Sequence, residues 1–188
     1  MQVLALIAVA LSAVSVLTGC ASPATHETVA SPGPPLTRNN CYSLLHQLLD
    51  QQKKVALIRF VKQEEDDVKR LIKKISADSG EGAQLLEKFA KDDPSINLRD
   101  LRLPPGEEAA RAAVADSRKK ELLSQTGDEF ELTLLLTQAQ ALSYAWHMAK
   151  VAGENEAQPD RARALAGVSK NMEDLYWQVF ALLLARAK

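Results

Sequence analysis

Three histidines are the side chains of this sequence that could bind a metal ion or transfer a proton near neutral pH. His26 lies in a proline-rich stretch, where we expect it to be solvated, so only His46 and His147 lie in segments with a helical pattern. A carboxylate-bridged di-metal centre in a helical bundle requires a glutamate three residues before a histidine on each of two helices. Ser43 and Tyr144 occupy those positions here. The sequence therefore predicts no metal centre and no metal cofactor.

Tyr144, Trp146 and His147 form the one locally unusual group of side chains in the second half of the chain. On a helix, residues 144 and 147 lie on the same side, whereas residue 146 lies across from them. One hypothesis is a small-ligand pocket between helices, lined by Tyr144 and His147. The other is that the three rings border the core with their polar tips at the surface. Both interpretations stay open at this point.

Cys20 lies where an uncharged apolar run ends. Residues 3–16 carry no charged side chain, and Leu17-Thr18-Gly19-Cys20 follows them. The run is too short to cross about 30 Å of hydrocarbon comfortably as a helix, and it has the length of the apolar region of a secretory signal peptide. The tetrapeptide resembles the lipobox of bacterial prolipoproteins, in which small residues precede the cysteine that is lipidated.

The resemblance implies a series of processing steps at Cys20. The thiol would receive diacylglycerol, a type II signal peptidase would remove residues 1–19, and the new amino group would be acylated, so that several acyl chains anchor the protein. Residue 21 is alanine rather than aspartate, which by the sorting rule of enteric bacteria resembles an outer-membrane lipoprotein facing the periplasm. Residues 1–2 lack the usual positive charge, which leaves a plain secretory signal or an uncleaved anchor as alternatives.

Cys41 is the only remaining thiol if Cys20 carries lipid. We expect it near the start of the first helix, where backbone N–H groups would lower the pKa of a thiol. In an oxidising compartment it could form an intermolecular disulfide or remain a free, reactive thiol. The alternative is a half-buried small residue beside Tyr42.

Residues 21–38 contain four of the eight prolines in the chain. Such a composition disfavours a helix and a core, so we expect an extended, disordered tether over residues 20–38 and a folded domain over 39–188.

The acidic run 64–67 is followed by basic residues at 69, 70, 73 and 74. Acids that precede bases by three or four residues are typical of a solvated helix face whose charges pair with each other. No serine lies in a nucleophile elbow, and the sequence has no phosphate-binding loop and no dinucleotide fingerprint. We therefore expect no enzyme and no cofactor.

The segments between the prolines of the folded part have helical periodicity. We expect a first helix that begins at the capping residues Asn39 and Asn40 and bends before it ends near residue 76. The other helices are expected at 81–91, 105–124, 128–153 and 159–187. The fourth is apolar over a wide arc, which predicts a central position, and the fifth has the spacing of a bundle seam. The prediction is an all-α fold, an antiparallel four-helix-type bundle with one extra short helix.

The helix order and the Gly127-x-x-Phe130 start of the fourth helix resemble the ferritin-like bundles of some exported bacterial proteins of unknown function. The acidic and histidine signature expected in the third main helix of those proteins is replaced by Thr137-Gln138-Ala139-Gln140. The resemblance therefore implies no activity.

The composition limits the classes of partner. The 188 residues have a net charge of −1, 46% hydrophobic and 25% charged side chains, and only 5% aromatics. Without a basic excess we expect no nucleic-acid binding. The leading prediction is a non-catalytic, lipid-anchored module at the cell envelope that binds another envelope protein or itself. The alternative is a bundle that binds a small ligand or a metal.

Overall fold

The computed structural model describes residues 33–60 and 65–186. The proposed signal peptide, Cys20 and the chain up to residue 32 lie outside these ranges. In the described residues the chain forms five α-helices and a short 3₁₀ helix, and no strand, which confirms the all-α fold. The elements are α1 (Pro34–Gln52), η1 (Val55–Phe60), α2 (Asp66–Asp92), α3 (Pro105–Ser124), α4 (Gly127–Glu154) and α5 (Pro159–Arg186).

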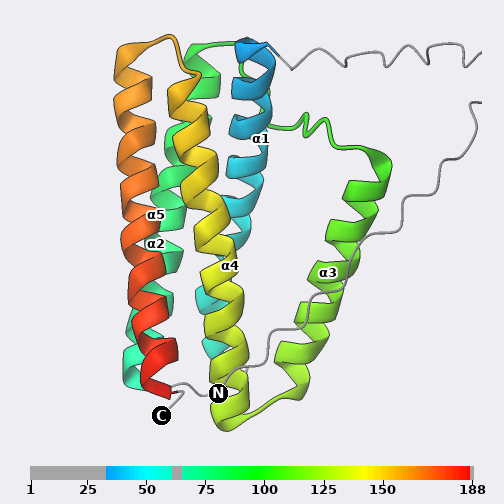
Figure 1. Cartoon of the computed structure of the whole chain (residues 1–188), viewed down its shortest axis with the longest axis vertical. Coiled ribbons are helices and arrows are strands. Elements are labelled where there is room, and N and C mark those ends of the chain that lie inside the picture. Colours follow the sequence, from blue (N-terminus) through cyan, green and yellow to red (C-terminus); the bar gives the residue numbers. More distant parts are fainter. Residues whose placement is uncertain (1–32, 61–64, 187–188) are drawn as a thin grey trace, which may run out of the picture. The chain divides into compact units, whose positions relative to one another are not determined.

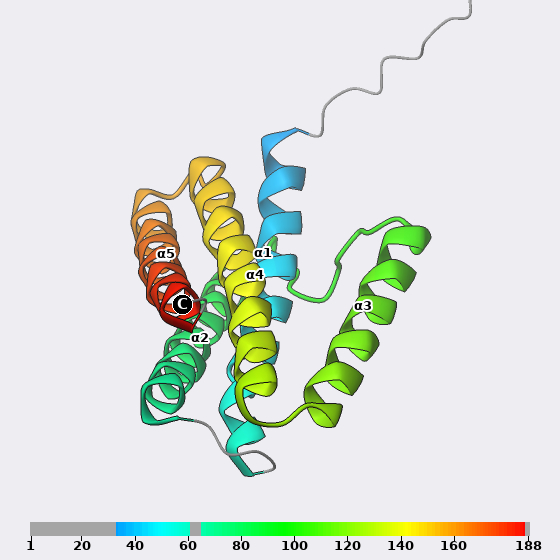
Figure 2. The same cartoon turned by 60° about the horizontal axis from the view of Figure 1, so that its bottom comes forward.

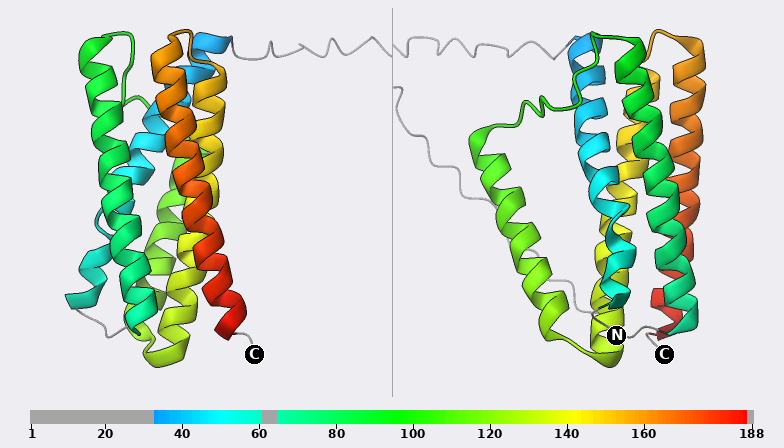
Figure 3. Two further views of the ribbon diagram at one scale, coloured as in Figure 1. Left: turned by 90° about the vertical axis from the view of Figure 1, so that its left-hand side faces the viewer. Right: turned by 180° about the vertical axis from the view of Figure 1, so that it is seen from behind.

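Four of these helices, α1, α2, α4 and α5, form the bundle (Figure 1). Two antiparallel hairpins, α1–α2 and α4–α5, pack so that α1 lies against α4 and α2 lies against α5. Helices α2 and α4 run in the same direction, so the chain must return along the bundle between them (Figure 3). Helix α3 makes that return, which is the single long crossover known from one class of four-helix bundles.

The core of the bundle is continuous through all four helices. Its largest fully buried side chains are Tyr42, Leu45, Leu49, Ile72, Ile75, Leu86, Phe130, Leu134, Leu135, Leu142, Leu165 and Met172. The predicted central position of α4 and the predicted seam along α5 are both confirmed, because each presents a row of buried apolar residues to its neighbours. Apolar burial of this extent is the main source of the bundle's stability.

The first half of the bundle departs from the sequence prediction. The single helix expected over 39–76 is wrong: α1 ends at Gln52, and η1 intervenes before α2 begins at Asp66. The breaks fall where the apolar pattern skips to polar residues, at 51–52 and 64–65. Asp66 and Asp67 then occupy the first turn of α2, where negative charge favours the exposed N–H groups of a helix start.

The short helix expected over 81–91 is also wrong, because α2 continues through Gly80 and Gly82 without interruption. Gly82 is buried at the contact between α1 and α2, and a Cβ atom there would lie 2.9 Å from Leu49 Cδ1. Glycine at this position therefore lets the two helices approach closely. The extra helix outside the bundle is α3, which the sequence placed correctly at 105–124.

The N-terminal boundary of the folded part lies earlier than predicted. Helix α1 begins at Pro34, with Gly33 as its capping residue, rather than at Asn39 and Asn40. Proline is tolerated in the first turn because its missing N–H would have no partner within the helix. Residues 34–38 of the predicted tether are therefore helical. Among the described residues, no helix combines the length and the apolar character that a bilayer crossing requires.

Candidate functional site

Helix α3 differs from the four bundle helices because none of its 20 residues is buried. It contacts chiefly α4 and stands apart from the bundle over most of its length (Figure 2). Its narrow apolar side faces α1 and α4, and Leu122 near its end packs against the core. The space between α3 and the bundle is a groove of about 1220 Å³, which we call the α3 groove.

The walls of the α3 groove are mainly apolar and come from α1, η1, α3 and α4. Its apolar lining residues are Leu48, Val55, Leu57, Ala110, Val114, Ala115, Leu122, Leu123, Leu134 and Ala141. Three of them are largely exposed: Leu57 by 58%, Val114 by 61% and Leu123 by 49%. A contiguous, solvent-accessible apolar surface of this kind is typical of a site where another molecule binds.

Four amide side chains interrupt this apolar wall, those of Gln51, Gln52, Gln138 and Gln140, and two of them carry a buried oxygen without a hydrogen-bond partner. Gln138 of α4 is only 2% exposed, and its Oε1 atom has no hydrogen-bond partner within the described structure. The same is true of Oε1 of Gln52, the last residue of α1, and both side chains line the α3 groove. Burying a carbonyl oxygen without a donor costs free energy, so native proteins usually satisfy such atoms. Both oxygens belong to side chains that line the groove but are themselves shielded from solvent, so a donor on a ligand reaches them only when the amide group turns toward the groove.

The charges that line the α3 groove are mostly positive. Lys54, Arg111, Arg118 and Lys119 border it, against the single acid Glu107. Three of the four cations have an acid nearby on their own segment: Lys54 Nζ lies 2.7 Å from Asp50, Arg111 Nε lies 2.7 Å from Glu107, and Arg118 Nη1 lies 2.8 Å from Glu121. Lys119 has no ion-pair partner among the residues that the structure describes.

The predicted pocket residues Tyr144 and His147 do lie together. Both line an open hollow of about 460 Å³ on α4, and Tyr144 also borders the α3 groove. The Tyr144 hydroxyl accepts a hydrogen bond from Arg111 Nη2 at 2.8 Å. His147 is exposed, and its Nδ1 atom donates to the Ser143 carbonyl at 2.7 Å. The polar groups here are thus partly committed to neighbours within the chain.

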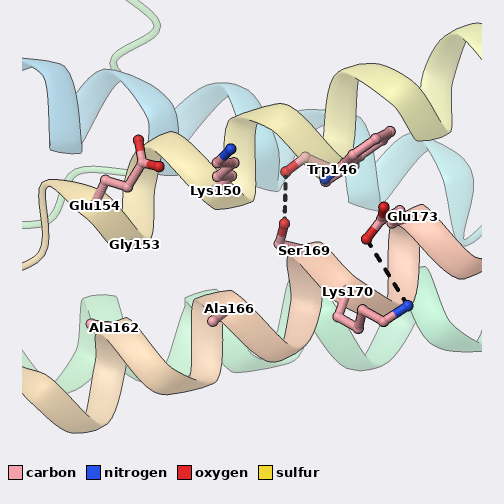
Figure 4. A pocket seen from close by; sticks show the side chains of 9 residues that line it. All are labelled: Trp146, Lys150, Gly153, Glu154, Ala162, Ala166, Ser169, Lys170 and Glu173. Carbon is pink, nitrogen blue, oxygen red and sulfur yellow. Dashed lines mark hydrogen bonds and ion pairs between the residues drawn. The ribbon is translucent and has the colours of Figure 1, made fainter.

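A second hollow, of about 560 Å³, lies on the seam between α4 and α5 (Figure 4). Three of its lining residues, Gly153 on α4 and Ala162 and Ala166 on α5, have small side chains or none. Ser169 donates to the Trp146 carbonyl at 3.2 Å, as the figure shows. The hollow therefore results from the small residues of the seam.

A third surface is aromatic. On α5, Trp177 is 52% exposed and Phe180 is 37% exposed, and their rings lie 5.8 Å apart. Tyr176 stacks on Phe180 with 6.2 Å between the ring centroids. These residues extend the core seam of α5 onto the surface as an aromatic stripe.

A network of ionisable groups at one end of the bundle joins α1 and α5 to the residue that follows α2, and it contains Tyr42, one of the two groups with the largest pKa shifts. The other is Asp50 near the end of α1, where bonds from Lys53 and Lys54 lower the pKa of the carboxyl to about 2. The buried Tyr42 hydroxyl donates to Glu156 Oε2 at 2.7 Å, and Arg161 Nη2 lies 3.0 Å from Glu156 Oε1 and 3.0 Å from Asp93 Oδ2. Burial and the bond to Glu156 raise the pKa of Tyr42. Burial alone would raise the pKa of Glu156, but bonds from Arg161, the Gln158 backbone and Tyr42 outweigh it and lower that pKa. Each acid here is paired, which is typical of a structural ion pair.

A second network closes the other end. Arg186 Nη2 lies 3.0 Å from Glu65 Oε2, 3.0 Å from Asp67 Oδ1 and 3.1 Å from Glu131 Oε2. The interpretation of the acidic run 64–67 as a self-paired face is therefore wrong for Glu65 and Asp67, which join α2 to α4 and α5. Residue 64 lies outside the described ranges.

Cys41 is free and only 6% exposed. It lies in the interior of α1 rather than at its start, and burial raises the pKa of its thiol. The predicted lowering of that pKa is therefore wrong, and the thiol packs in the core next to Tyr42.

Across the described residues, no three histidine, cysteine, aspartate or glutamate side chains gather closely enough to hold a metal ion. Comparison with known proteins found no matching family model, no matching curated protein and no matching solved structure. The site must therefore be interpreted from its own geometry, in which the α3 groove is the largest of the hollows described here.

Sequence reasoning identified Tyr144 but missed the rest of the α3 groove. The narrow apolar side of the 105–124 segment was a signal, because a helix with so little apolar surface cannot be buried on all sides. Gln138 was seen only as part of a replaced signature, and nothing in its sequence neighbourhood marks it as unpartnered.

Proposed function

We propose that this chain is a non-catalytic, lipid-anchored binding module of the bacterial cell envelope, and that the α3 groove is where it binds a partner protein. The single observation that carries the proposal is an open, mainly apolar groove bordered by a helix with no buried residue. Exposing such a surface to water is unfavourable, and covering it would stabilise a complex.

Two further observations support a binding role over a catalytic one. The two groups with the largest pKa shifts are both bonded within the chain: the Tyr42 hydroxyl donates to Glu156, and the Asp50 carboxylate accepts from Lys53 and Lys54. The α3 groove holds no histidine or cysteine and only one acid, Glu107. Histidine, cysteine and carboxylate side chains are among the groups that general acid–base and nucleophilic catalysis use most.

The alternative, a small-ligand site near His147, has weaker support. The hollow that Tyr144 and His147 line is open, and the hydroxyl of Tyr144 and Nδ1 of His147 are already bonded within the chain. A ligand site normally offers a concave, mostly apolar enclosure with a few polar groups directed at the ligand.

Site-specific photo-crosslinking tests the binding role. A benzoylphenylalanine is placed at Ala115, which lines the α3 groove, or at Ala112, which is exposed on the same helix outside the lining. In cells that produce the full chain natively, we expect a discrete protein adduct from position 115 and none from position 112. Equal adducts from both positions, or none from position 115, would contradict the proposal.

The anchoring part of the proposal rests on Cys20 and has a separate test. A Cys20→Ser variant is expected to accumulate as unprocessed precursor and to incorporate no labelled fatty acid, because the thiol that carries the diacylglycerol is gone. Fractionation of the native protein is expected to place it in the outer membrane, accessible from the periplasm. Normal maturation and sorting of the variant would show that the lipobox interpretation is wrong.

A further inference from the structure

The length of the α3 groove sets the size of what it can hold. Its lining on α3 runs from Glu107 to Leu123, which at 1.5 Å per residue corresponds to about 24 Å. A helix of about 16 residues has this length, and an extended acyl chain can span about the same distance. Length alone therefore admits either a peptide helix or a lipid chain.

The exposure of the groove favours an amphipathic occupant. Because α3 has no buried residue and Leu57, Val114 and Leu123 remain largely exposed, the α3 groove is open to solvent along its side. An acyl chain in it would keep much of its own surface in water. An amphipathic helix would bury its apolar face and leave its polar face outside, which is the usual mode of helix-in-groove recognition.

The two unpartnered amide oxygens favour the same class of occupant. Gln138 Oε1 and Gln52 Oε1 lie in the wall without donors. An acyl chain has no donor to offer them, whereas a serine, asparagine or tryptophan side chain on a peptide has one. A bound donor would remove the cost of leaving a buried oxygen unsatisfied.

The charged side chains at the border of the α3 groove indicate which kind of amphipathic helix it would bind. Lys119 is unpaired among the described residues, and the pairs of Arg111 and Arg118 lie on the surface of α3, where ion pairs contribute little and exchange readily. With Asp50 and Glu121 counted beside Glu107, four cations face three acids, and the unpaired Lys119 leaves a net positive border that complements a negatively charged partner.

From these observations we infer that the α3 groove binds an amphipathic α-helix of another protein, one with an acidic flank beside its apolar face and a hydrogen-bond donor within that face. The inference rests on the proposed function, since it names the partner class of the same groove. The donor meets Gln138 once its amide group turns toward the groove, the apolar face covers Val114 and Leu122, and the acidic flank lies along Lys119.

The test uses the full chain with the photo-crosslinker at Ala115 and adds a matched pair of charge reversals. Lys119→Glu changes a cation of the groove lining, and Lys120→Glu makes the same change on the same helix outside the lining. We expect Lys119→Glu to reduce the yield of the protein adduct about fivefold and Lys120→Glu to leave it unchanged. Mass spectrometry of the adduct is expected to place the crosslink in a segment with apolar residues at helical spacing and acidic neighbours.

A second variant tests the donor. Gln138→Met keeps the size of the side chain and removes its unpartnered carbonyl, so we expect the thermal midpoint to stay the same or to rise. The adduct yield is nevertheless expected to fall, because the partner's donor loses its acceptor. If Gln138 had a purely structural role, the thermal midpoint and the adduct yield would change in the same direction.

The outcomes separate the two proposals. Absence of any protein adduct at position 115 overturns the proposed function itself. A protein adduct that is insensitive to Lys119→Glu, or that maps to a segment without acidic residues, leaves the proposed function and overturns this inference. An adduct whose added mass is that of a second copy of the chain also overturns this inference alone, whereas an adduct with the mass of a lipid and no protein adduct overturns both proposals.

Discussion

The two sides of α4 are built from different kinds of side chain, although they belong to one continuous helix. Toward the other bundle helices, α4 presents Phe130, Leu135, Leu142 and Ala149, which are at most 1% exposed. Toward α3 it presents Thr137, Gln138, Gln140, Ala141 and Tyr144 as walls of a groove.

The two sides therefore serve different purposes: one stabilises the fold, and the other is available for binding. The bundle side buries apolar surface within the chain, which is what stabilises the fold. The groove on the α3 side leaves Leu57, Val114 and Leu123 largely uncovered, and this apolar surface adds little to the stability of the isolated protein but is available to a partner. Each prediction below compares the two sides.

The largest expected difference lies in local stability. Because α3 has no buried residue, its amide hydrogens should exchange through local openings that cost about 1–2 kcal/mol, as in an isolated helix. The core amides of α4 and α5 should require global unfolding, typically about 5–15 kcal/mol. Native-state hydrogen exchange measures both, and equal protection of α3 and α5 would show that α3 is part of the cooperative fold.

Truncating one apolar side chain in the bundle core and one in the α3 groove should lower the free energy of unfolding by unequal amounts. Leu45 is fully buried in the bundle, and we expect Leu45→Ala to lower the free energy of unfolding by about 3 kcal/mol. Val114 is 61% exposed in the groove, and Val114→Ala should change the free energy of unfolding by less than about 0.5 kcal/mol. Urea denaturation of both variants provides the measurement, and a comparable loss from Val114→Ala would argue that α3 closes onto the bundle.

Acid should weaken the bundle side through Glu156. The pKa of this carboxyl is lowered in the folded protein, so the unfolded chain binds more protons and the stabilisation is present above the ordinary value of 4.5 and lost as the pH falls through the lowered pKa. We expect Glu156→Gln to lower the free energy of unfolding by about 2 kcal/mol at pH 7. The variant should also show a flatter decline of that free energy between about pH 5 and 3.

Urea titrations across that pH range test this expectation. The exposed residue Glu154 supplies the control, because Glu154→Gln changes the same functional group without entering the network. If the Glu156 and Glu154 variants show the same pH dependence, the network does not carry the acid sensitivity.

The smallest expected effect comes from two glycines whose added methyl group would meet no atom within 4 Å. Gly167 lies within α5, and Gly167→Ala should raise the free energy of unfolding by about 1 kcal/mol through helix propensity. Gly106 lies in the first turn of α3, and Gly106→Ala should leave global stability unchanged because α3 is not coupled to it. Thermal unfolding of the two variants provides the comparison.

The second half of the fold could be predicted from the sequence because its boundaries have clear local causes. Pro105, Gly127 and Pro159 mark the starts of α3, α4 and α5 within one residue of expectation. The first half could not, because a polar gap at 51–52 is compatible with a bend as well as with a break. The role of Gly82 could not be predicted for a related reason: it depends on Leu49, which is distant in sequence.

The candidate site was predictable only in part. Tyr144 was found because aromatic and histidine side chains stand out in a sequence. The α3 groove depends on how far a crossover helix stands from the bundle, and the unpartnered state of Gln138 depends on what the fold fails to bring near it. Neither property has a local signature.

The crossover itself imposes an unequal constraint on the evolution of α3. Its length must match the distance between the two ends of the bundle, and 20 residues cover about 30 Å as a helix. The identity of its side chains is less constrained, because none of its residues is buried in the core. A lineage could therefore rewrite the residues that α3 presents, and so change what this protein recognises, while the scaffold that holds the helix in place stays as it is.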